Sequence, residues 1–454
     1  MLKAYLQRRP SVQLVLAFAA LIALGALLLS LPGMQEPAGQ HGLITALFTA
    51  TSAVCVTGLT VVDTGTEFSP AGQVVVLVLI QLGGLGILTV STWTILTLGK
   101  RRLGLAGRMV LEETHGSLAD IDPGRLLKQI ILFTFVTEAV GTLLLFFRFL
   151  FDYPAPRALW LALFHAVSAF CNAGFCLFPD SLTSYQQDLY VNVVIMALII
   201  AGGLGFIVVS DLIQRARTPK GQITLSLHTR TVLWMTAVLL VSGFCLFFLF
   251  EGADAEGGLS LEDRILPSAF LSVTSRTAGF NSIDTGSLGN ASLLVLILFM
   301  IIGASPGSTG GGVKTTTIAI VLAMLRSNLR NRTRTEIFCR TIPRDLVAKA
   351  LTILIAFIGT VAVVSLLIEL AEFGHFSQDM VRDRFLEHLF EVVSALGTVG
   401  LSTGITAQLT SVSKSLLMVC MFVGRLGPLL IADSLIGMRK ELDYRYPEER
   451  TMVG

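Results

Sequence analysis

Residues 48–60 read FTATSAVCVTGLT, a short apolar segment that runs into a single glycine. Three other stretches repeat this order: FHAVSAFCNAGFC at 164–176, FLSVTSRTAGFN at 270–281 and FEVVSALGTVGLS at 390–402. Each has a phenylalanine, a hydroxyl residue four positions later, and then a glycine followed by Leu or Phe. A pattern that recurs four times predicts a fold built from four copies of one unit.

The composition excludes an ordinary soluble protein. Of the 454 residues, 53% are hydrophobic and only 14% are charged, whereas soluble domains have about 25% charged residues. The mean hydropathy is +0.75. The six cysteines have neither the spacing of a metal site nor that of a disulfide framework. The chain is therefore expected to be an integral membrane protein.

Apolar runs long enough to cross a bilayer predict eight spanning helices. They lie near 11–31, 71–97, 126–150, 189–213, 231–250, 291–325 (interrupted), 346–370 and 414–437. The first run is longer than the apolar core of a signal peptide and lacks a clear cleavage site, so we expect it to be retained.

Four shorter apolar stretches, 43–55, 158–171, 264–275 and 384–396, are too short to cross and predict re-entrant half-helices. The expected fold is thus an all-α membrane protein with four helix–pore-loop–helix repeats in one chain. It would have eight transmembrane helices and four re-entrant half-helices around a pseudo-fourfold pore. The predicted units are repeat 1 at 1–100, repeat 2 at 101–217, repeat 3 at 218–340 with a broken second helix, repeat 4 at 341–437, and a cytoplasmic C-terminal tail at 438–454.

Lysine and arginine predict the orientation, because they favour the cytoplasmic side. They are concentrated in the N-terminus, 98–128, 214–230, 326–349 and the tail. The opposite side has few, and the segment 32–70 has none. Both termini are therefore predicted to be cytoplasmic.

The four glycine loops are the candidate functional site. Non-helical backbone at membrane depth persists only where it is buried or faces water. Four such loops can direct carbonyl oxygens at one axis and replace the hydration shell of a monovalent cation. The alternative is four packing loops without an ion. The loop residues are Val56, Thr57, Gly58, Asn172, Ala173, Gly174, Thr277, Ala278, Gly279, Thr398, Val399 and Gly400.

These loops, V-T-G-L, N-A-G-F, T-A-G-F and T-V-G-L, resemble those of the Trk/Ktr/HKT superfamily of potassium transporters, and the chain is most similar to its Ktr type. The resemblance covers nearly the whole chain. It implies a potassium uptake protein rather than an enzyme, with K⁺ held by the carbonyl oxygens of a selectivity filter and with Na⁺ as an activator. It also implies a homodimer in the bacterial cytoplasmic membrane, a cytosolic ring of nucleotide-binding RCK-type subunits (KtrA or KtrC), and no nucleic-acid partner. One glycine per repeat, instead of the longer TVGYG of potassium channels, implies looser discrimination between K⁺ and Na⁺.

A glycine-rich stretch, GASPGSTGGGVKTTT at 303–317, interrupts the sixth apolar run. It approaches a phosphate-binding G-x-x-x-x-G-K-[ST] loop, but Val313 separates the last glycine from the lysine, so the match fails. The resemblance implies an intramembrane gating loop; a passive packing kink is the alternative. The gating-loop residues would be Gly303, Ala304, Ser305, Pro306, Gly307, Ser308, Thr309, Gly310, Gly311, Gly312 and Lys314.

Arg425 lies in an apolar run, where arginine is costly and usually functional. Its motif, Gly-Arg-Leu-Gly at 424–427, corresponds to Gly-Gly-Leu-Gly at 83–86 and 202–205. The resemblance implies a positive barrier in the pore that contacts the gating loop; a purely structural role is the alternative.

Other polar residues leave two interpretations open. Glu138 and Glu369 could be functional or could form interhelical hydrogen bonds, and His165 is expected to be packed. Asp63, Asp180 and Asp284 follow the loops and either attract cations or cap turns. The basic segment 326–345 is expected to contact anionic lipid or, by the resemblance, the regulatory ring.

Two other functional classes are less consistent with the sequence. A nucleotide-binding or intramembrane enzyme would need a complete phosphate loop or a protease motif. A carrier with broken helices would have two inverted halves instead of four copies of one unit.

Overall fold

The computed structural model describes residues 10–36, 42–98, 123–217, 225–253, 261–373 and 384–427. The predicted tail at 438–454 and the end of the eighth apolar run lie outside these ranges.

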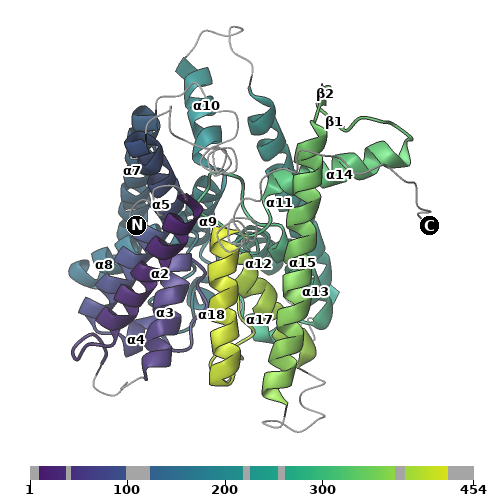
Figure 1. Ribbon diagram of the computed structural model, residues 1–454. Coiled ribbons are helices and arrows are strands. Elements are labelled where there is room, and N and C mark those ends of the chain that lie inside the picture. Colours follow the sequence, from purple (N-terminus) through teal and green to yellow (C-terminus); the bar gives the residue numbers. More distant parts are fainter. Residues whose placement is uncertain are drawn as a thin grey trace, which may run out of the picture.

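Helices account for most of the described chain (Figure 1). The longer helices are α2 (Pro10–Leu29), α5 (Pro70–Leu98), α7 (Pro123–Phe149), α11 (Leu227–Ala253) and α15 (Arg344–Glu372). The helices after the glycine loops of repeats 2 to 4 are α9 (Leu189–Gly203), α10 (Phe206–Arg217), α13 (Asn290–Ile301), α14 (Thr315–Leu329) and α18 (Ser411–Leu426). The short pieces are α4 (Thr64–Glu67), η1 (Thr183–Tyr185), η2 (Thr285–Ser287) and the paired strands β1 (Glu336–Ile337) and β2 (Arg340–Thr341).

Four helices in the described ranges are long and apolar enough to cross a membrane on their own: those at 12–29, 127–149, 227–250 and 344–372. A fifth candidate is the pair α9 and α10, which is bent by 97° at a short break. The expected span at 291–325 consists of two shorter apolar helices, α13 and α14. The sequence predicts this interruption. It does not predict the break between α9 and α10 in the run at 189–213.

Four half-helices precede the glycine loops: α3 (Leu43–Cys55), α8 (Ala155–Phe170), α12 (Leu261–Thr274) and α17 (Phe385–Gly397). They have 13, 16, 14 and 13 residues. At about 1.5 Å per residue the longest reaches about 24 Å, short of a hydrocarbon core about 30 Å thick. Their lengths match the prediction that they cannot cross a bilayer.

The helices pack in a repeating order. Each half-helix lies against the long helix before it, as α3 does on α2, α8 on α7, α12 on α11 and α17 on α15. Each also contacts a helix of another unit, through the pairs α3–α18, α8–α5, α12–α9 and α17–α13. Because the first unit contacts the last, the four half-helices form a closed set. Figure 1 shows α18, the last of these helices in the chain, beside α3.

Close backbone approach explains the repeated glycines after each loop. A side chain on Gly83 would collide with the carbonyl oxygen of Val54 at the end of α3. Gly202 and Gly424 meet Phe170 and Leu396 in the same way. A glycine at this position therefore lets the second helix of a unit touch the end of its own half-helix.

Candidate functional site

The four loop glycines share one backbone conformation. Their φ angles are +96° at Gly58, +70° at Gly174, +75° at Gly279 and +92° at Gly400, a region that side chains disfavour. Two residues before each glycine, Val56, Asn172, Thr277 and Thr398 also have positive φ. The four loops thus share positive φ angles at the same two positions, even though the third copy is one residue shorter between its hydroxyl residue and its glycine.

The loops contact one another in a ring. A Cβ atom placed on Gly58 would lie 2.5 Å from the carbonyl oxygen of Ala173 in the second loop. The same atom on Gly174 would lie 2.9 Å from the oxygen of Ala278 in the third loop. On Gly279 it would lie 2.6 Å from the oxygen of Val399 in the fourth loop.

The ring closes at Gly400, where a Cβ atom would collide with the carbonyl oxygen of Thr57 in the first loop. Four carbonyl groups, from Thr57, Ala173, Ala278 and Val399, therefore alternate with four glycines around one centre. Any side chain at these glycines would collide with the backbone of the neighbouring loop.

The hydroxyl residues of the repeat form hydrogen bonds with the backbone of the loops. Ser52 and Ser394 accept hydrogen bonds of 3.1 Å from the backbone N–H of Gly58 and Gly400. In the two middle repeats the hydroxyls donate instead: Ser168 to the carbonyl of Phe175 and Thr274 to that of Phe280, each at 2.7 Å. The sequence pattern singled out these residues, and their contacts assign them to loop geometry.

Two further positioning residues directly follow the repeat phenylalanine. Nε2 of His165 accepts from the backbone N–H of Leu177 at 3.4 Å, three residues past Gly174. Oε1 of Glu391 accepts from the N–H of Thr403 at 3.2 Å, three residues past Gly400. Glu391 was not predicted as part of the site, and His165 was expected only to be packed. The sequence does contain a signal for both residues, because a polar residue follows the repeat phenylalanine in two otherwise apolar half-helices.

The acidic residues beyond the loops cap turns. Asp63 and Asp284 each accept from the N–H two residues later, of Gly65 at 2.9 Å and Gly286 at 3.1 Å. Asp180 accepts from Thr183 Oγ1 at 2.7 Å and from the hydroxyl of Ser184. Partial burial alone would raise the pKa of Asp180, but the hydrogen bonds from these hydroxyls lower it below its ordinary value.

The glycine-rich segment at 303–314, the predicted gating loop, folds back on itself. The N–H of Gly303 donates to the carbonyl of Val313 at 2.9 Å, and Lys314 Nζ donates to the carbonyl of Gly310 at 2.7 Å. Ser308 Oγ donates to the carbonyl of Ser305 at 2.6 Å. The segment is therefore an ordered loop, in which the lysine is held by backbone of the same segment.

This segment lies against three of the four glycine loops. A Cβ atom on Gly310 would collide with Oγ1 of Thr277 in the third loop and lie 3.3 Å from the side-chain amide of Asn172 in the second, and one on Gly311 would collide with Oγ1 of Thr398 in the fourth. A Cβ atom on Gly312 would lie 3.3 Å from the carbonyl oxygen of Gly397. The glycines at 310–312 therefore allow the segment to pack directly on the loops.

The break between α9 and α10 forms backbone hydrogen bonds with the segment at 303–314. The N–H groups of Ser305 and Thr309 donate to the carbonyls of Gly203 and Gly202, at 3.1 and 3.2 Å. The N–H of Phe206 donates back to the carbonyl of Gly307 at 2.9 Å. The bend thus frees backbone groups that pair with the segment, as non-helical backbone at membrane depth requires.

Arg425 connects the segment to two other units. Its guanidinium donates from Nη1 to the carbonyl of Thr309 and from Nη2 to that of Gly83, at 2.6 Å. The side chain is buried on α18. One cation therefore links the last unit, the first unit and the glycine-rich segment.

The two membrane glutamates have interhelical partners. Glu369 on α15 accepts from Nδ1 of His388 on α17 at 2.8 Å. Glu138 on α7 accepts from Gln81 on α5 at 3.3 Å. Interhelical hydrogen bonding, the alternative left open for both residues, is therefore present.

Three threonine hydroxyls and one guanidinium nitrogen of the loops have no hydrogen-bond partner in the described chain: Oγ1 of Thr57, Thr277 and Thr398, and Nε of Arg276. Buried polar groups are normally paired, so this cluster is unusual. No group of three or more His, Cys, Asp or Glu side chains in the described ranges could hold a metal ion. The ring instead offers neutral oxygens, the ligands that suit a weakly bound monovalent cation.

Comparison with known proteins identifies similar chains. The sequence matches the TrkH family, described as cation transport protein, over residues 8–436. Potassium/sodium uptake protein NtpJ of Enterococcus hirae is 38% identical over all of this chain and 99% of its own. Ktr system potassium uptake protein B of Bacillus subtilis is 39% identical over 98% of this chain and 97% of its own.

A solved structure supports the same fold. The crystal structure of the potassium transporter TrkH from Vibrio parahaemolyticus matches with a TM-score of 0.69 and 18% identity. The match covers 93% of this chain and 83% of that one. The predicted class of all-helical, multi-pass membrane protein is confirmed.

Proposed function

The chain belongs to the TrkH family of cation transport proteins, a family of transporters and not of enzymes, and on this premise we propose that it takes up potassium across the cytoplasmic membrane. The ring of Gly58, Gly174, Gly279 and Gly400 carries the proposal. The names of the two relatives, a potassium/sodium uptake protein and a Ktr system potassium uptake protein, support the choice of ion.

In this proposal the twelve loop residues named above form the selectivity filter. The carbonyls of Thr57, Ala173, Ala278 and Val399 would replace the hydration shell of K⁺. The half-helices end three to five residues before the glycines, so their negative ends would favour a cation without a charged ligand. The unpartnered hydroxyls of Thr277 and Thr398 would face the ion or its water at the inner side of the filter.

The repeat architecture belongs to the same proposal. The units at 1–100, 101–217, 218–340 and 341–437 would surround one pseudo-fourfold pore, with both termini in the cytoplasm. The cyclic order of half-helix contacts, in which α3 of the first unit packs on α18 of the last, supports this arrangement.

We propose that the segment at 303–314 gates the pore. It packs on the loops through Gly310 and Gly311, and it is bonded to α9 and α10 through backbone groups alone. A loop held by backbone pairs at a helix break can change position when the helix moves. The alternative, a passive kink, predicts that deleting the segment leaves ion flux unchanged.

Arg425 would be the positive barrier of the closed pore. Its buried charge lies between Gly83 and Thr309, and a cation passing the filter would meet it in a low-dielectric setting. When the segment moves, the bond to Thr309 would break and the charge could swing away.

The partners follow from membership of a Ktr system. We propose a homodimer whose cytosolic side binds a ring of RCK-type subunits, KtrA or KtrC, near 214–230 and 326–345. The hairpin of β1 and β2 lies in the second region and is largely exposed; it carries Arg340, and the exposed Arg332 precedes it. We also propose that Na⁺ activates uptake.

The test is uptake of radioactive rubidium into potassium-starved cells that lack their own potassium uptake systems. Cells expressing the chain together with a KtrA- or KtrC-type subunit should accumulate rubidium, and added potassium should compete. External sodium should increase uptake.

The same measurement is made on a Gly279→Ser variant produced to the same level as the unaltered protein. Because a side chain at this glycine would collide with Val399, the variant should lose uptake or its preference for potassium over sodium. Uptake that is insensitive to potassium, or unchanged in the variant, would show that the glycine ring is not the filter.

A further inference from the structure

A cavity of about 470 Å³ opens between α5, α7 and α8, and none of its lining residues belongs to the glycine ring. Its wall is almost entirely apolar, and its size lies within the range of about 300–1,000 Å³ found for small-molecule sites. Its lining includes Leu77, Val78, Phe135, Leu143, Leu159 and Leu163.

The cavity opens on the outer face of its helices. Val78, Phe135 and Leu159 are each at least half exposed, and the helix at 127–149 is long and apolar enough to cross a membrane, so we expect this opening to face lipid. A molecule dissolved in the membrane can therefore enter from the side, without passing through water.

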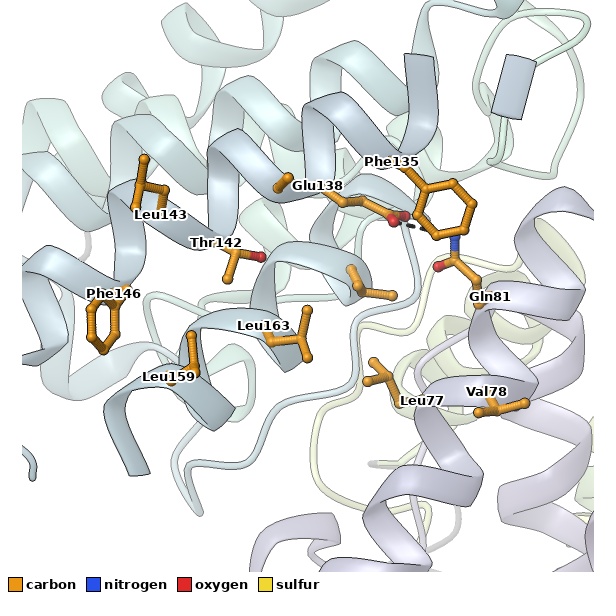
Figure 2. A pocket seen from close by; sticks show the side chains of 12 residues that line it. Leu77, Val78, Gln81, Phe135, Glu138, Thr142, Leu143, Phe146, Leu159 and Leu163 are labelled. Carbon is orange, nitrogen blue, oxygen red and sulfur yellow. Dashed lines mark hydrogen bonds between the residues drawn. The ribbon is translucent and has the colours of Figure 1, made fainter. Parts of the chain in front are cut away.

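Two polar groups interrupt the apolar wall. Glu138 is 4% exposed, and within the described chain its carboxylate has only long contacts, 3.3 Å to Gln81 Nε2 and 3.9 Å to Cys171 Sγ. Oγ1 of Thr142, one turn along α7, is buried without any partner in the described chain. Figure 2 shows Glu138 and Thr142 on the same helix, with Gln81 facing Glu138 from α5. A carboxylate has about four acceptor positions, so this end of the cavity has unused acceptors.

The depth of Glu138 restricts the occupant. It lies at the middle of the span at 127–149, near the centre of the bilayer. A phospholipid headgroup cannot reach this depth without a large desolvation cost, and an acyl chain offers no hydrogen-bond donor. A molecule that is uncharged and has one hydrogen-bond donor avoids the desolvation cost and can still bond to Glu138.

We propose that this cavity binds a membrane-dissolved alcohol, whose apolar body lies against Leu159 and Leu163 and whose hydroxyl group donates to Glu138. The inner end of the site is close to the filter region, because Sγ of Cys171, the residue before Asn172, lies 3.6 Å from Oε1 of Gln81. The proposal concerns binding and does not depend on the transported ion.

Photolabelling of the purified full-length protein in lipid nanodiscs tests the proposal. The probe is octanol that carries a diazirine group on its chain, and labelled residues are located by mass spectrometry. Label should concentrate on the cavity-facing residues of α7 and α8. Excess octanol should compete, whereas a methyl ether of equal length, which lacks the donor, should compete several-fold less well, as expected for the loss of one hydrogen bond of about 1 kcal/mol.

Four variants, one of them a control, separate the site from general partitioning into lipid. Leu163→Trp should fill the cavity and reduce labelling at least about tenfold. Leu367→Trp is its control, because Leu367 on α15 is similarly exposed, 41% against 37% for Leu163, and lines no part of this cavity. Glu138→Leu should reduce labelling, and Glu138→Gln, which keeps an acceptor oxygen, should retain most of it.

Labelling spread over all lipid-facing helices and unchanged in Leu163→Trp would overturn the proposal. Equal competition by the alcohol and the ether would also overturn it, even if a variant failed to fold, because that comparison uses the unaltered protein.

Discussion

The guanidinium group of Arg425 on α18 donates a hydrogen bond to the backbone carbonyl of Thr309, 116 residues earlier in the chain. The same side chain donates to Gly83 on α5. A buried cation whose hydrogen bonds end on two distant backbone segments holds those segments at a set distance. In the proposed transporter, this bond would keep the 303–314 segment beneath the filter.

Arg425→Ala should raise rubidium uptake at equal expression. Hydrogen bonds to charged groups contribute about 1.5–3 kcal/mol each, so losing the bond to Thr309 should shift the closed–open balance by about tenfold or more. Arg425→Lys should be intermediate, because a single ammonium group cannot reproduce the planar fork that bonds both Thr309 and Gly83. Lower uptake in the alanine variant, with equal protein in the membrane, would instead assign Arg425 a structural role.

Gly58→Ala should abolish selective uptake, whereas Gly404→Ala should not. Both glycines have positive φ, +96° and +90°, so both variants strain the backbone by about 1 kcal/mol. Only at Gly58 would the new methyl group lie 2.5 Å from a carbonyl oxygen of the next loop; Gly404 has open space. The measurement is rubidium uptake in competition with potassium and with sodium. Equal losses in the two variants would attribute the effect to backbone strain alone.

Gly205→Ala should deregulate uptake, and Gly427→Ala is its matched control. The two glycines occupy the same place in the repeat and have φ of +90° and +87°. A Cβ atom on Gly205 would lie 2.5 Å from the carbonyl oxygen of Pro306, whereas one on Gly427 would meet no described residue within 4 Å. Displacing Pro306 should loosen the 303–314 segment, which we would detect as uptake that no longer requires the cytosolic subunit. If both variants still require that subunit, the break in α9 and α10 does not control the segment.

Thr277→Val should lower uptake without destabilising the protein. The substitution keeps the shape and removes a buried hydroxyl that has no partner in the described chain. If the hydroxyl faces the ion path, its loss should reduce uptake or selectivity while the unfolding temperature stays equal or rises, because an unpaired buried polar group is costly. Thr285→Val is the control, since its hydroxyl is also buried and unpaired but lies beyond the filter in η2. An equal effect on uptake in both variants would contradict a role at the ion path.

The local pattern was sufficient to predict the half-helices, the four loops and the interrupted third unit. A phenylalanine, a hydroxyl residue and a glycine at fixed spacing determine a short helix and the tight turn that ends it, and these depend on neighbours in the chain. The same reasoning could not find the break between Gly203 and Phe206, because the Gly-Gly-Leu-Gly motif there also occurs at 83–86, where α5 continues without a break. The bend exists because Ser305 and Thr309 pair with the freed carbonyls.

Residues with distant partners were equally invisible in the sequence. Glu391 and His165 look like isolated polar residues in apolar half-helices, and only folding brings them to the backbone of Thr403 and Leu177. The free acceptors of Glu138 likewise became evident only when α5, α7 and α8 enclosed a cavity around it.

The sequence by itself determined the membrane class and the positions of the half-helices and loop glycines, and it predicted the division into four units, because hydropathy, helix length and positive φ are properties of short segments. Only the tertiary structure decided how the units are joined. The order in which each glycine meets the next loop's carbonyl, and the closure from Gly400 back to Thr57, depend on packing between segments that lie far apart in the sequence. Nothing in a local stretch specifies that packing, because it is selected by the fit of the assembled helices.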